Sequence, residues 1–324
     1  MNNIINEDIR NLSNRSYWER LHNRKILITG ATGMLGAYLA YAAAKHSNAE
    51  LFLLCRNQSK ARELFADIDC NFIFQDVREP LTINEQIDFI LHTAGPVGPS
   101  VFENTPVDVI SANVTGTLSL LDYARGHNCK GFVFASTHEV YGAVNGEQVE
   151  ENTSFGIDIT APRSCYVLAK QTAENALACA FKQYGLRTLI ARFSRLYGPL
   201  MNLESGLFIC DFTKNKINNE PIHIHGGLNL LRPLLYISDA ADAMLNVLAN
   251  GQKGEAYNAQ GDEITSIGEI AGLISEHIIS DKPETKELPP SGHWLNCDKL
   301  KSLGWKQTVP LTNGIKRTIE YFEG

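Results

Sequence analysis

Residues 25–36 read KILITGATGMLG, and this stretch decides the fold. Its first residues are mostly apolar and β-branched, as in a short buried strand, and the run ends at a glycine. Alanine-rich sequence from 34 to 45 then predicts a helix. The order of strand, tight turn and helix predicts the opening of a βαβ unit.

The same alternation recurs along the chain. Short apolar strands are predicted at residues 50–55, 71–74, 88–95, 131–136 and 187–193, with helical segments between most of them. Parallel strands joined by right-handed helical crossovers form a sheet that is buried on both faces. The sequence therefore predicts an α/β fold, with a doubly wound parallel (Rossmann) sheet and a smaller C-terminal α/β substrate region.

The pattern loosens after about Gly198, where segments such as PIHIHGG (221–227) carry glycine and histidine, and a helix near 239–248 stands alone. We expect this helix to belong to the first domain, to which the chain returns. The predicted parts are an N-terminal helical extension (1–24), an NAD(P)-binding Rossmann domain (25–195, with 232–248 returning to it), and a substrate-binding domain (196–231 and 249–324).

Composition narrows the class of protein. The 324 residues are 44% hydrophobic and 20% charged, which is enough apolar material for a large core. The net charge of -7 comes from mixed charges without a basic block, so nucleic acid and anionic membranes are poor candidate partners. These features favour a small-molecule substrate.

The seven cysteines are scattered and lack CxxC spacing, which argues against a disulfide framework and a structural zinc site. The histidines show no metal-ligand spacing, so we expect no metal. The polar N-terminus and the lack of a long apolar run predict neither a signal peptide nor a membrane span. We expect a cytoplasmic protein.

The glycine turn between the first strand and the first helix is a candidate dinucleotide site. Backbone can approach a pyrophosphate closely there, and the helix amides face its charge. Such a turn by itself can also be only a tight connection, but its place after the first strand of a βαβ series favours cofactor binding. The candidate residues are Gly30, Thr32, Gly33, Met34, Leu35 and Gly36.

The end of the second predicted strand bears on the choice between NAD and NADP. An acidic residue there would accept hydrogen bonds from the ribose of NAD, but the sequence has Arg56. An arginine can pair with the 2′-phosphate of NADP, so we lean slightly towards NADP; Arg56 could also be an ordinary solvated side chain. Further cofactor contacts are expected after the third and fourth strands, at Asp76, Val77, Thr93, Ala94 and Gly95.

Tyr166 and Lys170 are one helical turn apart and share a helix face. A phenol is a poor base at neutral pH, but a nearby cation favours phenolate, which can exchange a proton with an alcohol during hydride transfer. A Tyr-Lys pair at this spacing is often an ordinary surface pair. Here it follows the glycine turn and Ser136-Thr137, which favours catalysis.

Together these motifs resemble the extended short-chain dehydrogenase/reductase family, and within it the nucleotide-sugar epimerases, 4,6-dehydratases and UDP-glucuronate decarboxylases. The resemblance covers nearly the whole chain. It rests on GATGMLG (30–36), HTAG (92–95), NVTGT (113–117), ASTHEVYG (135–142), PRSCYVLAK (162–170), RFSRLYGP (192–199), RPLLYISD (232–239) and GW (304–305).

The resemblance implies catalytic roles. Thr137 matches the serine or threonine that binds the sugar 4-hydroxyl, Tyr166 would take the proton of that hydroxyl, and Lys170 would also hold the nicotinamide ribose. Asn113 would shape the helix behind the nicotinamide. Ser136 and Phe193 lie in the matched motifs and complete the candidate cofactor-binding residues.

Glu139 distinguishes members of the family, because dehydratases and decarboxylases carry a glutamate two positions after the threonine. A 4-keto sugar has an acidic C5 proton, which a carboxylate could abstract; Glu139 could instead be a structural acceptor. His138 stands where some dehydratases have an acidic aspartate. It is a candidate acid, because its ordinary pKa suits neutral pH, or else a strand-end histidine with no proton to move.

The resemblance also implies substrate contacts. Arg232 matches an arginine that clamps the diphosphate, and its alternative is a structural surface arginine. Arg195 replaces a sugar-contacting asparagine, and Asp211 replaces an asparagine before Phe212 at the nucleobase pocket, so the nucleobase is not determined. His225 is expected on a pocket wall. Residues 286–299 lack the arginine with which decarboxylases hold a carboxylate.

The sequence therefore predicts an NAD(P)-dependent enzyme that oxidises C4 of a nucleotide-diphosphate sugar and continues, in dehydratase-like or decarboxylase-like fashion, through a 4-keto intermediate. The alternatives are a 4-epimerase or 4-dehydrogenase/reductase, and a non-catalytic NAD(P)-sensing protein. The helices around 116–125 and 166–184 resemble those of a four-helix dimer interface in this family, so we expect a homodimer.

Overall fold

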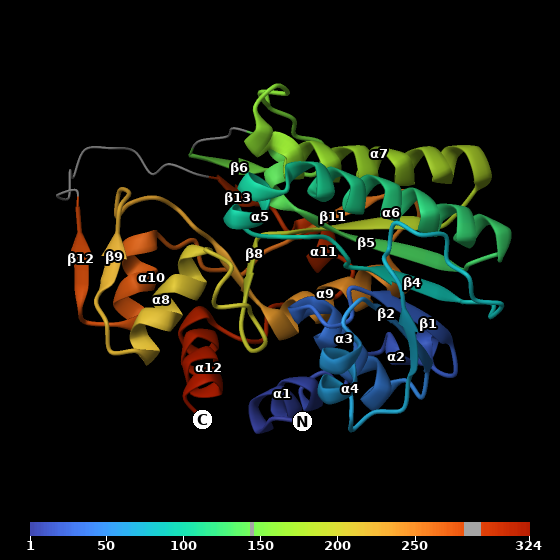
Figure 1. Cartoon of the computed structure of the whole chain (residues 1–324), viewed down its shortest axis with the longest axis horizontal. Helices are drawn as coiled ribbons and strands as arrows, with labels where there is room; N and C mark the ends of the chain where they lie inside the picture. The colour runs from blue at the N-terminus through green and yellow to red at the C-terminus, as the bar shows by residue number, and fades with distance from the viewer. Residues whose placement is uncertain (143–145, 282–292) are drawn as a thin grey trace.

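A seven-stranded sheet forms the centre of the computed structural model, which describes residues 1–142, 146–281 and 293–324 (Figure 1). All neighbouring strands in it are parallel. The first strand lies in the interior and the order reverses around it, as in a doubly wound sheet, so the predicted fold class is confirmed. In order across the sheet the strands are β3 (Asn71–Phe74), β2 (Glu50–Cys55), β1 (Lys25–Thr29), β4 (Phe89–His92), β5 (Gly131–Thr137), β7 (Thr188–Phe193) and β11 (Ala256–Ala259).

Helices cover both faces of this sheet (Figure 1). Ile26 and Ile28 of β1 join the core that contains α3 and α9, whereas Leu27 joins the core that contains α6 and α7. All three side chains are fully buried, which explains why β1 is apolar throughout and does not alternate with polar residues. The helices of this part are α3 (Met34–His46), α4 (Gln58–Leu64), α5 (Pro99–Asn104), α6 (Pro106–Gly126), α7 (Cys165–Tyr184) and α9 (Ile237–Asn250).

A smaller lobe, at the left of Figure 1, carries short helices and the two-stranded parallel ribbon of β9 (Ile222–Ile224) and β12 (Ile278–Ser280). β11 was expected in the substrate region, but it pairs with β7 at the edge of the large sheet, because α9 returns the chain there. The remaining helices are α8 (Phe208–Ile217), α10 (Ile267–Ile274), α11 (Asp298–Lys301) and α12 (Leu311–Glu323). The other ribbons are β8 (Arg195–Tyr197) with β10 (Leu234–Tyr236), and β6 (Glu147–Val149) with β13 (His293–Leu295).

The N-terminal extension forms the helices α1 (Asn3–Arg10) and α2 (Trp18–Leu21) and is part of the core. The buried carboxylate of Asp8 accepts hydrogen bonds from Tyr38 (2.8 Å) and Tyr236 (2.9 Å), and pairs with Arg317 at 2.9 Å. These three partners lie on α3, β10 and α12. One carboxylate therefore ties the extension to both lobes, because a buried charge needs several partners.

Candidate active site

The candidate residues meet at the carboxyl edge of the sheet. β1, β4, β5 and β7 lie side by side in the sheet, and Thr29 is opposite His92. Thr137 at the end of β5 is opposite Phe193, the last residue of β7. The glycine turn follows β1 directly. In parallel sheets the crevice beyond the carboxyl ends is where ligands bind.

Close packing accounts for two of the glycines in the turn. Gly30 has φ of 64°, and a Cβ there would lie 2.7 Å from the Cα of Ala94; a Cβ on Gly36 would lie 2.5 Å from the Gly30 oxygen. Gly33 is the N-cap of α3 and offers no side-chain cap. The first-turn amides, which have no intrahelical partner, are therefore open to a pyrophosphate. Thr32, Met34 and Leu35 lie in the same turn and first helical residues.

Arg56 is exposed beyond the end of β2, and its Nη1 lies 3.9 Å from Oδ2 of Asp76. Asp76 also accepts bonds from Arg78 at 2.9 and 3.0 Å. These partners, Arg78 first, hold the pKa of Asp76 below its usual range. Val77 is buried against Gly116, where a Cβ would lie 2.9 Å from it. The exposed Arg56 thus faces a carboxylate that would repel a phosphate.

The backbone after β4 turns towards the glycine turn. β4 ends at His92, three residues before its predicted end, because Thr93 leaves the ladder and donates its hydroxyl to the Thr29 oxygen at 2.7 Å. A Cβ on Gly95 would lie 2.8 Å from Oδ1 of the buried Asn113. That oxygen has no hydrogen-bond partner among the described residues. The position fits a residue that shapes the nicotinamide pocket.

Tyr166 and Lys170 project from α7 towards β5. The Lys170 ammonium donates to the Ala135 oxygen at 2.7 Å and lies 4.3 Å from the centre of the Phe134 ring. The Tyr166 ring stacks on Phe102 of α5, with 4.7 Å between ring centres. Both side chains are buried, so the pair is not an ordinary surface pair.

Burial dominates the proton affinities of this pair. It raises the pKa of Tyr166 well above its usual range, and the charge of Glu139 raises it further, whereas a hydrogen bond with Thr137 opposes the shift. Burial also lowers the pKa of Lys170 to about 7, against the opposing charge of Glu174. Ser136, next to Thr137, has a buried hydroxyl with no partner within the described ranges. Phenolate here therefore depends on the lysine and on bound groups.

Glu139 lies in the short 3-10 helix η1 (His138–Tyr141), which the Thr137 side chain caps by accepting the Glu139 amide at 3.3 Å. Its carboxylate lies 3.4 Å from Nη2 of Arg163, in η2 (Pro162–Ser164), and its charge acts on Tyr166. The Arg163 guanidinium lies 4.8 Å from the Phe102 ring centre. The sequence reasoning missed Arg163 and Phe102 as site residues, although Arg163 lies within the PRSCY motif.

His138 is buried and its Nδ1 lies 3.3 Å from Nε2 of His293. Burial, followed by the charge of Arg195, lowers the pKa of His138 well below its ordinary value. The imidazole is therefore neutral at neutral pH and does not store a proton for donation. Nothing near His293 in the sequence indicated this contact, which depends on the pairing of β6 with β13.

Arg195 and Arg232 lie side by side at the substrate end. Arg195 of β8 is opposite Leu234 of β10, and Arg232 lies two residues before Leu234. Burial lowers the pKa of both arginines, and the neighbouring Arg232 lowers that of Arg195 further, to about 10. Two guanidinium groups thus enrich this end in positive charge.

The other predicted substrate residues lie in the smaller lobe. Phe212 is buried in α8 with its ring edge-on to Phe208, and Asp211 is exposed beside it. His225 is exposed and follows β9, which lies with β12 at the outer edge of the lobe (Figure 1); it pairs with Asp281 at 2.6 Å. The structure therefore gathers the candidate catalytic residues and the two arginines, while His225 has a partner of its own. Residues 286–292, from the stretch without arginine, lie outside the described residues.

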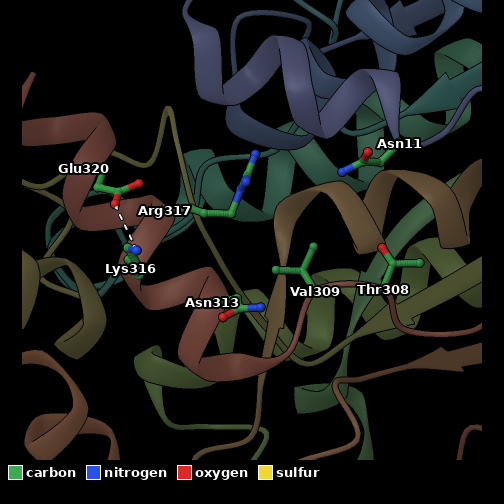
Figure 2. Close-up of a pocket in the computed structure, with 7 residues that line it drawn as sticks. All are labelled: Asn11, Thr308, Val309, Asn313, Lys316, Arg317 and Glu320. Atoms are coloured by element: carbon green, nitrogen blue, oxygen red, sulfur yellow. Dashed lines mark ion pairs between the residues drawn. The ribbon is translucent and has the colours of Figure 1, made fainter.

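A separate pocket opens between the N-terminal extension and α12 (Figure 2). It contains none of the predicted site residues. In the described part of the chain, no cluster of three or more His, Cys, Asp or Glu could hold a metal, and no helix is long and apolar enough to cross a membrane. The pocket is lined by Asn11, Thr308, Val309, Asn313, Lys316, Arg317 and Glu320.

A doubly wound parallel sheet with a glycine turn after its first strand and a Tyr-Lys pair beside its fifth strand defines a dinucleotide-binding protein of the short-chain dehydrogenase/reductase type. The model of the NAD dependent epimerase/dehydratase family matches residues 26–259. The chain belongs to this family, and the resemblance inferred from its motifs is confirmed.

Known relatives carry out different reactions. The chain is 27% identical over 309 residues to UDP-glucuronic acid decarboxylase 1 of Danio rerio, covering 92% of this chain and 72% of that protein. It superposes on dTDP-glucose 4,6-dehydratase of Bacillus anthracis, solved with NAD (TM-score 0.79, 19% identity, 93% and 96% of the two chains). It also superposes on UDP-glucuronic acid 4-epimerase of Bacillus cereus, solved with UDP-glucuronic acid and NAD (TM-score 0.79, 22% identity, 92% of this chain and 99% of that chain). Such structural likeness shows the fold and does not choose among the reactions.

Proposed function

We propose that this protein oxidises C4 of a nucleotide-diphosphate hexose and uses the resulting ketone for a reaction at C5, an elimination or a decarboxylation, before the hydride returns. The observation that carries the proposal is the placement of Glu139 two residues after Thr137, with its charge acting on Tyr166. One carboxylate thereby stands beside the group that exchanges the C4 proton.

The residues at the end of β5 and on α7 divide the first step between them. The Thr137 hydroxyl, which bonds Tyr166, would also bind and orient the sugar 4-hydroxyl. Tyr166 would take its proton, and Lys170 would stabilise the phenolate by its charge. NAD bound at the glycine turn would supply the acceptor for the C4 hydride and later return it. Gly33, the residues around it and Asn113 would hold this cofactor.

Glu139 would act in the second step. In the elimination, a ketone at C4 acidifies the C5 proton, and a carboxylate within reach can remove it. The decarboxylation instead breaks the bond from C5 to the carboxyl carbon and removes no C5 proton. Arg163 pairs with the Glu139 carboxylate at 3.4 Å, which orients it. Arg163 is therefore a positioning residue, because it acts through Glu139.

We propose NAD as the cofactor, in place of the slight preference for NADP drawn from Arg56. Asp76 faces Arg56 at 3.9 Å and would repel a 2′-phosphate. The family is described as NAD dependent, and the solved relatives above hold NAD. Fluorescence titration of the purified protein with NADH and NADPH tests this, and tighter binding of NADPH would reverse the choice.

A panel of nucleotide hexoses and nucleotide uronic acids, analysed by mass spectrometry, tests the function. We expect a product that has lost one water or one carbon dioxide. If every nucleotide sugar that turns over gives a product of unchanged mass, the C5 reaction is excluded.

A 4-epimerase is the second candidate, and His138 favours it. An elimination needs an acid for the departing hydroxyl, and burial keeps His138 neutral. Epimerisation needs no such acid. Net oxidation or reduction would instead change the absorbance of the nicotinamide. This change distinguishes a 4-dehydrogenase from a 4-epimerase and from an enzyme that catalyses the C5 reaction.

We also propose that the protein is a homodimer formed through α6 and α7. Three apolar side chains of α6 are exposed, namely Val107 (75%), Ile110 (43%) and Leu118 (52%). Exposed apolar side chains along one helix are typical of an interface. Light scattering should report a dimer, and Leu118→Lys should shift it towards the monomer; a monomeric wild type would exclude the dimer.

A further inference from the structure

Arg195 lies between the catalytic residues and Arg232. It comes two residues after Phe193, which is opposite Thr137 in the sheet, and it is itself opposite Leu234. The charge of Arg232 acts on Arg195, and the charges of both act on His138, with that of Arg195 the stronger, so the two guanidinium groups lie near each other and near the end of β5.

Neither of these arginines has an ion-pair partner within the described part of the chain. Two other half-buried arginines do have one: Arg192 binds Glu174 at 2.6 Å, and Arg15 binds Asp242 at 2.8 Å. Arg187, also half-buried, instead donates to the backbone oxygens of Leu248 and Gly251. This contrast is informative because a desolvated charge is costly unless it is paired. A pair of half-buried guanidinium groups without carboxylates is a site built for anionic groups of a ligand.

The carboxylate of Glu139 does not neutralise this pair. Its charge acts on Arg195, but its ion pair is with Arg163. His138, on the same side, is neutral, and the repulsion between the arginines contributes to the lowered pKa of Arg195. An anion bound to Arg195 would relieve that repulsion.

We propose that Arg195 binds a carboxylate on the sugar ring, so that the substrate is a nucleotide-linked uronic acid and not a neutral hexose. The proposal rests on the proposed function and on the diphosphate contact that the family resemblance implies for Arg232. A sugar whose C1 phosphate lies at Arg232 and whose C4 lies at Thr137 must span the distance between them. A carboxylate at C6 projects from the ring edge between these two points, where Arg195 lies, and a guanidinium can hold it through two hydrogen bonds.

Calorimetry with matched ligands tests this, in the Tyr166→Phe background so that no sugar is consumed. The ligands are UDP-glucuronic acid, UDP-glucose and UDP, together with the 1-phosphates of glucuronic acid and glucose, which carry no nucleobase. We expect the uronic acid to bind about tenfold or more tightly than its neutral partner in at least one of the two series, the effect of one charge-assisted hydrogen bond.

Two substitutions separate the roles of the arginines. Arg195→Gln should abolish the preference for the uronic acid and leave the affinity for UDP-glucose and UDP within about twofold. Arg232→Gln should weaken the binding of all the phosphate ligands by a similar factor and keep the preference for the uronic acid. Thermal unfolding checks that both variants fold.

Three results would overturn the proposal: no preference for the uronic acid in either series, a preference that survives Arg195→Gln, or equal weakening of all ligands by Arg195→Gln, which would make Arg195 a second diphosphate contact. The measurement reports binding alone. A protein that prefers the uronic acid but has no C4 chemistry would refute the proposed function and leave this inference standing.

Discussion

The two sides of the crevice are built differently. On the cofactor side the close approaches are between backbone groups, as where Gly30 meets Ala94 and Gly36 meets the Gly30 oxygen. On the substrate side the groups are charged side chains from distant segments, among them Glu139, Arg195 and Arg232. The proposed cofactor side thus depends on close backbone packing, whereas the proposed substrate side depends on charged side chains that come from segments distant in the sequence.

The largest effect is expected at Tyr166, because the proposed function has it contact both the sugar and the cofactor. Tyr166→Phe should lower turnover by about 10³-fold, as loss of proton transfer removes one general acid-base group. Tyr184→Phe, on the same helix but exposed, should have no effect. Steady-state rates of the two variants make the comparison, and unchanged turnover of every nucleotide sugar by Tyr166→Phe would favour a non-catalytic NAD-binding protein.

A smaller loss, confined to the second step, is expected at Glu139. Glu139→Gln should slow product formation by about 10²-fold, while C4 oxidation continues and reduced cofactor accumulates at the nicotinamide absorbance band. Glu150→Gln, an exposed carboxylate nearby in sequence, is the control. If C4 oxidation and product formation fall together, Glu139 acts in the first step or in folding.

The difference between the two sides of the crevice also explains which features could be predicted from the sequence. One continuous stretch of sequence forms β1, the glycine turn and α3. Its hydrophobic pattern and the spacing of its glycines were enough to predict these elements. Tyr166 and Lys170 were found because helix geometry fixes a four-residue spacing. The contact of His293 with His138 was not predicted, because it depends on the pairing of β6 with β13. No local sequence pattern encodes a pairing between strands so distant in the chain. The roles of the predicted site residues remain predictions.

On the cofactor side, Gly36→Ala should destabilise the protein. Its Cβ would lie 2.5 Å from the Gly30 oxygen and 2.9 Å from the Ala31 Cα, and backbone atoms cannot move aside cheaply. We expect a loss of about 1–3 kcal/mol of unfolding free energy, in the range of overpacking mutations. Gly272→Ala, a helical glycine with open space around it, should be neutral or stabilising. Urea unfolding measures both; equal effects would refute this account of the turn.

The smallest effect is a pH dependence at His92, which is buried between Thr29 (2.8 Å) and Thr117 (3.1 Å). Burial lowers the pKa of His92 to about 3, from 6.5 in its ordinary state. The folded state therefore binds fewer protons, so stability is complete above pH 6.5 and falls as the pH drops towards 3.

Replacing this histidine should flatten that dependence. His92→Gln should reduce the slope of unfolding free energy between pH 6 and 4 by about 1.4 kcal/mol per pH unit. His22→Gln, on the exposed surface, should leave the slope unchanged. Unfolding curves at several pH values measure these slopes. Equal slopes of unfolding free energy against pH in the wild type and His92→Gln would contradict a neutral buried His92.

The most direct test of the central claim, C4 oxidation followed by chemistry at C5, is turnover of the nucleotide sugars of the panel in D₂O. The position of deuterium in the product is read by NMR. We predict deuterium at C5 for either reaction, because decarboxylation leaves an enolate that takes its proton at C5 from solvent, and after elimination the hydride returns to C6 while C5 takes the solvent proton. A product formed at full turnover without carbon-bound deuterium would contradict the account and leave simple hydride exchange at C4.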